Sequence, residues 1–257
     1  MKAPVLGLGV IWAIAAVAPA SAAPDPAAQP AEIGGPRNSY ANPSAVIAAE
    51  LALAQDAQVR GQWTALAAAA APEAVLFMPG MVRAQPWLKG RPNPPAATRW
   101  QPHELWSSCD GSLMVSRGAW QKPAPAEASG PGTAPTGYYS IIWRRQDDGR
   151  YKWVLDHADT LASPLAAPEM MAARIADCPP PKERTARSKQ AAAKAQKSSK
   201  LPPLDPLREH GAADDGSLQW TVTLDSSGAR TLNVRWRKDG EERVALRDEV
   251  AGRPGGT

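Results

Sequence analysis

The sequence predicts an α+β fold in which N-terminal helices pack on a curved antiparallel sheet and a small C-terminal β-hairpin forms an extension. Residues 44–71 are rich in alanine and carry apolar side chains at helical spacing. Residues 101–159 contain four strand-like segments with alternating side chains, and an Asp-Gly pair at 110–111 marks a tight hairpin. The chain also has 10 tryptophans against one phenylalanine, so a few large side chains must supply much of the core.

The first 23 residues have the pattern of a secretory signal peptide. Lys2 precedes an uncharged apolar run, and small residues near Ala22 provide a cleavage site. An uncleaved membrane anchor is the alternative, but the run falls short of the roughly 20 residues needed to span a bilayer. We therefore expect a periplasmic or secreted chain with no stable membrane insertion after cleavage. Residues 24–43, rich in proline and alanine, are expected to be a disordered lead-in.

Two helices are expected next. Pro43 suits the first position of a helix that continues to Arg60. The apolar residues expected on its inner face are Ile47, Leu51 and Ala54. A second helix is expected over 62–71, because Gly61 separates it from the first and Pro72 ends it.

The sheet is expected to follow a short strand near residue 75 and a proline-rich crossing with one helical turn at 84–89. Its four long strands are expected at 103–109, 112–121, 136–146 and 150–159. Strict alternation on the last of these predicts that Tyr151, Trp153, Leu155 and His157 share a face. The sheet needs cover on at least one side, and the helices are the obvious cover.

The two cysteines favour a disulfide between Cys109 and Cys178. A cysteine pair in an exported chain is more often a disulfide than a catalytic thiol, with two buried free thiols as the alternative. Cys109 lies at the hairpin bend, and Cys178 ends a segment expected to form a closing helix at 167–178. The main domain, closed by this segment, is therefore assigned to 44–178.

The remainder is predicted as a proline-rich and basic linker at 179–214 and a small β extension at 215–250. Residues 182–200 carry seven basic side chains and one acidic one. This charge run is interpreted as a solvated linker, with a patch for an anionic lipid or polymer as the alternative. No aromatic residues interleave with it, and the net charge is only +4, so no nucleic-acid partner is expected.

This order of elements resembles the nuclear-transport-factor-2-like superfamily, which includes SnoaL-like and ketosteroid-isomerase-like proteins. The resemblance covers roughly residues 44–160 and is closest to a branch of unknown function. It rests on the segments "ELALAQDAQVRGQWTAL", "LFMPG", "AQPWLKG", "RWQPHELWSSCDGSL" and "GYYSIIWRRQDDGRYKWVLDHAD". It implies a cone-shaped fold with a pocket between the helices and the concave sheet face, and a sheet that supports a homodimer.

Tryptophans are the expected wall of that pocket for a small-molecule ligand. The residues assigned to it are Trp63, Trp106, Trp120, Trp143 and Trp153, with Met78 and Trp87 beside them. The alternative is that these side chains simply fill the cone.

Catalytic residues are not specified by the pattern, and Asp156 and His157 are the weak candidates. They lie on opposite faces of an extended strand, so both cannot line one pocket, whereas Asp159 shares a face with His157. Ketosteroid isomerases of this fold pair a carboxylate base with a facing hydroxyl or acid. Asp156 or Glu50 with Tyr138 or Tyr139 would be analogous, but none matches that family's motif.

The sequence predicts no metal site and no cofactor, because His103, His157 and His210 are scattered and no nucleotide motif occurs. The leading hypothesis is an exported cone-fold domain that binds a small apolar or aromatic ligand or acts as a scaffold. An isomerase-, cyclase- or dehydratase-type enzyme is the first alternative. A cell-envelope interaction protein that uses the basic linker and the C-terminal hairpin is the second.

Overall fold

The computed structural model describes residues 40–124, 134–181 and 201–252. The expected signal peptide, nearly all of the expected lead-in and the basic segment 182–200 lie outside these ranges. The described residues belong to one compact unit. The C-terminal strands therefore belong to the same unit as the main sheet.

A seven-stranded sheet forms the middle of this unit, in the order β2-β1-β6-β5-β4-β3-β7. The strands are β1 (Ala70–Phe77), β2 (Met81–Arg83), β3 (Arg99–Ser107), β4 (Leu113–Gln121), β5 (Thr136–Arg145), β6 (Tyr151–Leu161) and β7 (Ala172–Ile175). The four long strands are antiparallel and joined in sequence, as expected. The sheet is mixed, however, because β1 runs parallel to β6 and β7 runs parallel to β3.

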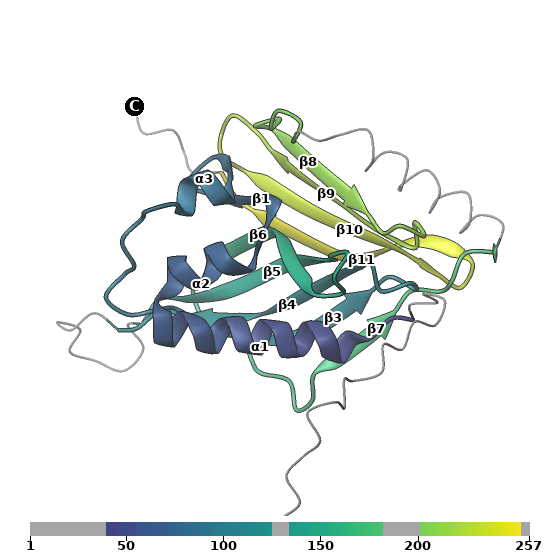
Figure 1. Cartoon of the computed structure of the whole chain (residues 1–257), viewed down its shortest axis with the longest axis horizontal. Helices are drawn as coiled ribbons and strands as arrows, with labels where there is room; N and C mark the ends of the chain where they lie inside the picture. The colour runs from purple at the N-terminus through teal and green to yellow at the C-terminus, as the bar shows by residue number, and fades with distance from the viewer. Residues whose placement is uncertain (1–39, 125–133, 182–200, 253–257) are drawn as a thin grey trace, which may run out of the picture. The chain divides into compact units, whose positions relative to one another are not determined.

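Helices α1 (Pro43–Arg60) and α2 (Gln62–Ala69) contact one face of this sheet, and α3 (Ala84–Leu88) contacts β1 (Figure 1). The predicted inner face of α1 was wrong. Its buried residues are Val46, Glu50, Leu53 and Ala57, whereas Leu51 is 48% exposed. Alanine on several sides of the helix makes its apolar stripe weak, so the sheet decides which side is buried. No helix of the described ranges is long and apolar enough to cross a membrane.

The expected closing helix does not form. Residues 172–175 instead make strand β7, which pairs in parallel with the edge of β3. The backbone NH of Ala176 continues the pairing by donating to the carbonyl oxygen of Ser107 at 2.9 Å. An extended chain satisfies the open hydrogen-bonding groups of an edge strand, which a helix at this position would leave unpaired.

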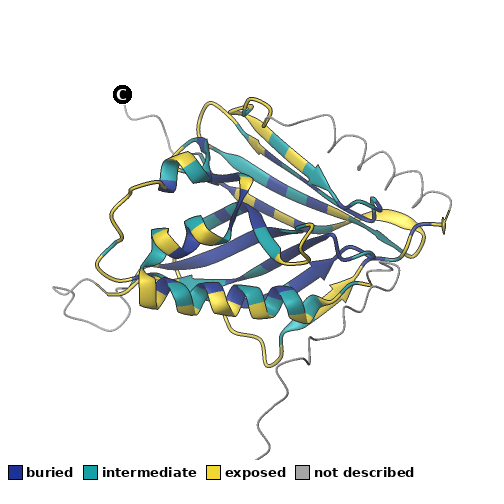
Figure 2. Cartoon of the chain, in the orientation of Figure 1, coloured by how far each residue is buried: buried dark blue, intermediate teal, exposed yellow. Residues whose placement is uncertain are grey.

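The C-terminal part is a four-stranded sheet in the order β11-β10-β9-β8, larger than the expected hairpin. Its strands are β8 (Arg208–Ala212), β9 (Leu218–Leu224), β10 (Arg230–Lys238) and β11 (Glu241–Val250), so it begins inside the segment expected to be linker. Its buried residues join those of the first sheet in a single hydrophobic cluster. Figure 2 shows buried positions alternating with more exposed ones along these strands.

Side-chain contacts place this second sheet on the face of the first sheet that is opposite the helices. The buried carboxylate of Asp248 on β11 accepts hydrogen bonds from Arg117 Nε on β4 at 3.1 Å and from Ser140 Oγ on β5 at 2.5 Å. On the same two strands, Ser116 and Tyr139 point to the other side, toward α1. The unit is therefore three layers: helices, seven-stranded sheet, four-stranded sheet.

A bulge in β6 overturns the predicted alternation on that strand. Trp143 of β5 pairs with Trp153, and the preceding residue, Ile142, pairs with Leu155, so Val154 is left without a partner. The extra residue moves Trp153 to the helix side, while Leu155 and His157 face the second sheet.

Candidate functional site

The central feature of the helix-facing side is a buried carboxyl on α1. Glu50 has no exposed surface, and its Oε1 accepts a hydrogen bond from the Tyr139 hydroxyl on β5. Its Oε2 is buried with no hydrogen-bond partner among the described residues. Across the same face, Trp143 Nε1 donates to Ser116 Oγ at 3.0 Å. Helix and sheet thus meet at a polar cluster, defined here as Glu50, Tyr139, Ser116 and Trp143.

Burial decides the protonation of this cluster. Removal from water raises the pKa of Glu50 from 4.5 to about 7, and the polar groups of Ser116, Tyr139 and Trp143 beside it lower the value only in part. Burial and the adjacent Glu50 charge also raise the pKa of Tyr139 well above its ordinary value. At neutral pH, Glu50 is therefore divided between its acid and its carboxylate, and Tyr139 is neutral.

Asp156 on β6 brings a second carboxyl to the same face. It pairs with Ile141 across the strands, two residues from Tyr139, and its charge raises the pKa values of both Glu50 and Tyr139. Burial raises its own pKa to about 6, although Arg230 opposes the shift. The residue is partly exposed, and its carboxyl makes no hydrogen bond to the described residues. It is thus a partly exposed acid beside the Glu50–Tyr139 pair, without a hydrogen-bond partner among the described residues.

His157 lies on the opposite face, as the strand geometry predicted, and its environment makes it a core residue. It is fully buried, neither ring nitrogen has a hydrogen-bond partner among the described residues, and its ring meets Phe77 edge to face at 5.7 Å. Burial first, and the charge of Arg230 second, lower its pKa to about 3. The imidazole is neutral at physiological pH, and Asp159 makes no contact that orients it.

The predicted pocket tryptophans fall into three groups. Trp143 and Trp153 face the helices but are almost completely buried, and Trp153 Nε1 donates to Leu66 O on α2 at 3.0 Å. Trp63 and Trp120 are partly exposed.

Trp106 was misplaced, because a bulge between Pro102 and Glu104 puts it opposite Val115, on the face away from the helices. The remaining neighbours, Met78 and Trp87, lie at the loop after β1 and on α3, and Trp63 meets Trp87 edge to face at 5.4 Å.

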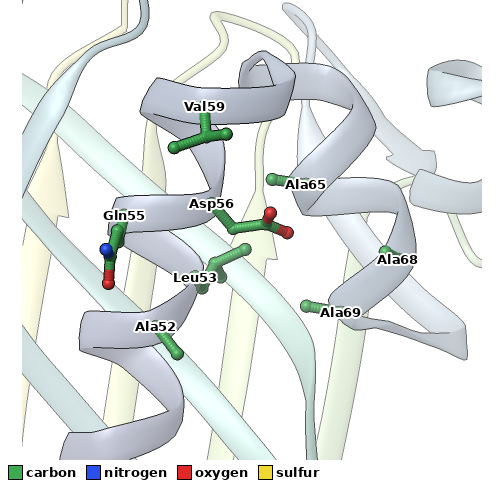
Figure 3. Close-up of a pocket in the computed structure, with 8 residues that line it drawn as sticks. All are labelled: Ala52, Leu53, Gln55, Asp56, Val59, Ala65, Ala68 and Ala69. Carbon is green, nitrogen blue, oxygen red and sulfur yellow. The ribbon is translucent and has the colours of Figure 1, made fainter.

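A separate groove runs between α1 and α2 on the outside of the helical layer (Figure 3). Its volume is about 510 Å³, and its lining is Ala52, Leu53, Gln55, Asp56, Val59, Ala65, Ala68 and Ala69. None of the polar cluster, and none of the predicted tryptophans, lines it. The groove and the candidate acid–base residues are therefore distinct features.

The predicted disulfide is confirmed: Cys109 and Cys178 are bonded, with their Cα atoms 5.1 Å apart. The bond joins the β3–β4 turn to the chain that follows β7 and leaves neither cysteine as a free nucleophile. Within the ranges that the structure describes, no three His, Cys, Asp or Glu side chains gather as a group that would hold a metal ion.

The chain matches no protein-family model and no curated protein. Solved structures similar to it include a candidate ketosteroid isomerase from Parabacteroides distasonis, at 12% identity over 49% of this chain and 97% of that one, with a TM-score of 0.35. A candidate aromatic ring hydroxylase from Novosphingobium aromaticivorans matches at 14% identity over 48% and 90% of the two chains, also with a TM-score of 0.35. A candidate calcium/calmodulin-dependent protein kinase II association domain from Xanthomonas campestris matches at 14% identity over 53% and 99%, with a TM-score of 0.33.

One of these neighbours is thus a candidate member of the ketosteroid-isomerase-like group that the sequence resembles. Each match spans about half of this chain.

Sequence reasoning offered Glu50 with Tyr139 as one of several carboxyl–hydroxyl pairs but could not select it. The signal available was an acidic residue on a helix whose other side chains are mostly alanine and leucine. Only the rotation of α1 on the sheet shows that this acid points inward, toward a tyrosine 89 residues away.

Proposed function

We propose that this chain is an exported protein that binds a small apolar ligand on the helix-facing side of its seven-stranded sheet, with Asp156 as the polar contact. The observation that carries the proposal is the unpaired, partly exposed carboxyl of Asp156 beside the Glu50–Tyr139 pair. A carboxylate that is partly removed from water and has no hydrogen-bond partner in the protein loses hydration at a cost in free energy. A ligand that supplies a donor would relieve that cost, with its apolar body on the helix-facing side of the sheet.

Calorimetric titration with 2-naphthol, an aromatic probe with one hydroxyl, tests the proposal. Since the pKa of Asp156 is about 6, its carboxylate accepts the naphthol hydroxyl at pH 8 but is largely protonated at pH 5. We expect several-fold tighter binding at pH 8. Asp156→Asn should remove this pH dependence, whereas Asp159→Asn, on the same strand but the opposite face, should retain it. Absence of binding, or pH dependence unchanged by Asp156→Asn, contradicts the proposal.

A second candidate function is proton transfer of the isomerase type. It is favoured by the elevated pKa of Asp156, since a base with a pKa near the working pH is suited to accept and return a proton. The carboxylate would take a proton from a C–H beside a ligand carbonyl, and the resulting acid would return it to another carbon. The Tyr139 hydroxyl, which already donates to Glu50, lies on the same face.

Exchange of the α-hydrogens of 2-indanone in D₂O, followed by NMR, tests this second function. The wild-type chain should accelerate exchange over buffer, and Asp156→Asn should lose the acceleration while Asp159→Asn keeps it. Equal rates for wild type and Asp156→Asn would leave ligand binding as the only function supported.

The envelope-interaction hypothesis rests on two features. The C-terminal strands pack on the main sheet and share its core, so they are not a free hairpin, but their sheet carries a groove on its outer face. The basic segment 182–200 lies outside the described residues.

A further inference from the structure

The two sheets contain the same four-strand unit. Strands β3 to β6 and strands β8 to β11 each lie in consecutive order as antiparallel neighbours. The first turn of each unit has the sequence Asp-Gly-Ser-Leu, at residues 110–113 and 215–218. In both turns the glycine has a left-handed backbone, with φ of 66° at Gly111 and 71° at Gly216. No other residue type adopts this conformation as readily.

The register of the strands is also the same. Leu113, the last residue of the first motif, lies opposite Arg144, and Leu218 lies opposite Trp236. The third strand of the first unit begins at Thr136. Nine residues later, the NH of Arg145 donates to the carbonyl oxygen of the motif serine at 2.9 Å, and the equivalent bond from the NH of Arg237 in the second unit is 2.8 Å.

Each unit has a bulge at the same place between its third and fourth strands. In the first unit the pairing shifts between Ile142 and Trp143, three residues before Arg145. In the second it shifts between Val234 and Arg235, three residues before Arg237. A bulge is a local irregularity, and its repetition at one register position is not required by sheet formation in general. The units therefore match in strand order, in the first turn, in register and in this bulge.

The two turns also bind each other reciprocally. The NH of Asp110 donates to Asp215 Oδ2 at 3.0 Å, and the NH of Asp215 donates to Asp110 Oδ2 at 3.0 Å. The serine hydroxyl of each motif accepts a hydrogen bond from a backbone NH of the other unit. That NH belongs to the residue just before the motif aspartate. These bonds are Cys109 N to Ser217 Oγ at 2.8 Å and Asp214 N to Ser112 Oγ at 2.9 Å. Each bond from the first unit to the second has a counterpart from the second to the first. Such reciprocal contacts are those of two units related by a local twofold axis.

A further reciprocal pair lies away from the turns. Tyr138 Oη on β5 donates to the carbonyl oxygen of Glu249 on β11, and Arg230 Nη2 on β10 donates to that of Ala158 on β6. By the common register, Tyr138 is equivalent to Arg230 and Ala158 to Glu249. The twofold relation thus extends over the interface and is not confined to one turn contact.

The faces that point away from this interface differ between the two units. In the first unit that face is covered by α1 and carries Ser116 and Ile141. At the equivalent positions the second unit has Thr221 and Asn233. These line a polar groove of about 490 Å³, together with Gln219, Trp220, Thr223, Thr231, Arg235 and Arg247, and no helix of the described residues covers it. A sheet face without a helical cover needs polar side chains, so the two outer faces differ.

We propose that residues 208–250 are a second copy of the four-strand unit of residues 99–161 and serve as its built-in partner. The chain contains both halves of a pseudo-twofold sheet pair, so the sheet face opposite the helices is closed to a second molecule. The full chain is therefore a monomer.

A double-mutant cycle on the full chain tests the reciprocal contact. Asp110→Ala and Asp215→Ala each remove bonds in both turns, so their effects on the unfolding equilibrium should be similar and should deviate from additivity by more than about fivefold. The matched control is Asp225→Ala. Asp225 forms the same kind of local turn with Ser227 and Ala229 and has no contact across the sheets, so it should combine additively with Asp110→Ala. Additive effects of Asp110→Ala and Asp215→Ala would overturn the proposal.

Sedimentation equilibrium of the wild-type chain over a wide concentration range is the second measurement. The mass of one chain at all concentrations supports the built-in partner. A concentration-dependent dimer would overturn it. The ligand-binding proposal does not depend on this result, because Asp156 and Glu50 lie on the other side of the sheet.

Discussion

The buried carboxyl of Glu50 gives the sharpest prediction, through the substitution Glu50→Gln. Its pKa rises from 4.5 to about 7 on folding, so the folded chain holds this proton more tightly than the unfolded chain does. The stabilisation from the neutral acid is complete below pH 4.5 and is lost as the pH rises through about 7. At about 1.4 kcal/mol per pKa unit, the loss amounts to about 3 kcal/mol.

Urea unfolding at intervals from pH 4 to pH 8 measures this effect. Glutamine has the shape of the protonated acid and does not ionise, so Glu50→Gln should match the wild type near pH 4 and exceed its stability by about 3 kcal/mol at pH 8. The difference between the two curves isolates Glu50, because Asp156 titrates in both chains. The control is Glu169→Gln, at an exposed site, which should give a flat difference. A flat difference for Glu50→Gln would refute a strongly raised pKa at this position.

Three further substitutions test other contacts. Tyr139→Phe removes the hydrogen bond to the buried carboxyl and should cost about 1–3 kcal/mol in urea unfolding, with the acid titrating at a still higher pH; an unchanged stability would argue against the bond. Replacing Cys109 and Cys178 together by alanine opens a loop closed over 69 residues, and should cost about 4 kcal/mol by the chain-entropy estimate, measured against the oxidised wild type. Asp248→Ala leaves Arg117 without its partner between the sheets and should cost about 3 kcal/mol; it should cost clearly less in an Arg117→Ala background, and equal costs in both would show that the pair is not coupled.

Local signals in the sequence were reliable where a residue type has a strong backbone preference. Pro43 begins α1, and Gly61 separates it from α2, as expected. The Asp-Gly turn at 110–111 joins β3 and β4. Where a preference was weak, the predicted face or element was wrong, as with the inner face of α1 and the helix expected at 167–178.

The candidate site could be predicted only in part. Alternation along β6 correctly separated Asp156 from His157, because both lie beyond the bulge at Val154. It failed for Trp153, which lies before the bulge. A single unpaired residue shifts the alternation along a strand. Side chains before it therefore lie on the opposite face from the one that strict alternation predicts, and the sequence gives only a weak signal for such a residue.

The sequence by itself determined the main helices, the four long strands and the Asp-Gly turn, because these depend on residue types and short spacings. It also left a single possible disulfide, because the chain has only two cysteines. The tertiary structure decided that Glu50 points into the sheet and that the last four strands cover its other face. Both outcomes depend on which surfaces meet when the layers pack, and the free energy of that packing is shared among residues far apart in the chain.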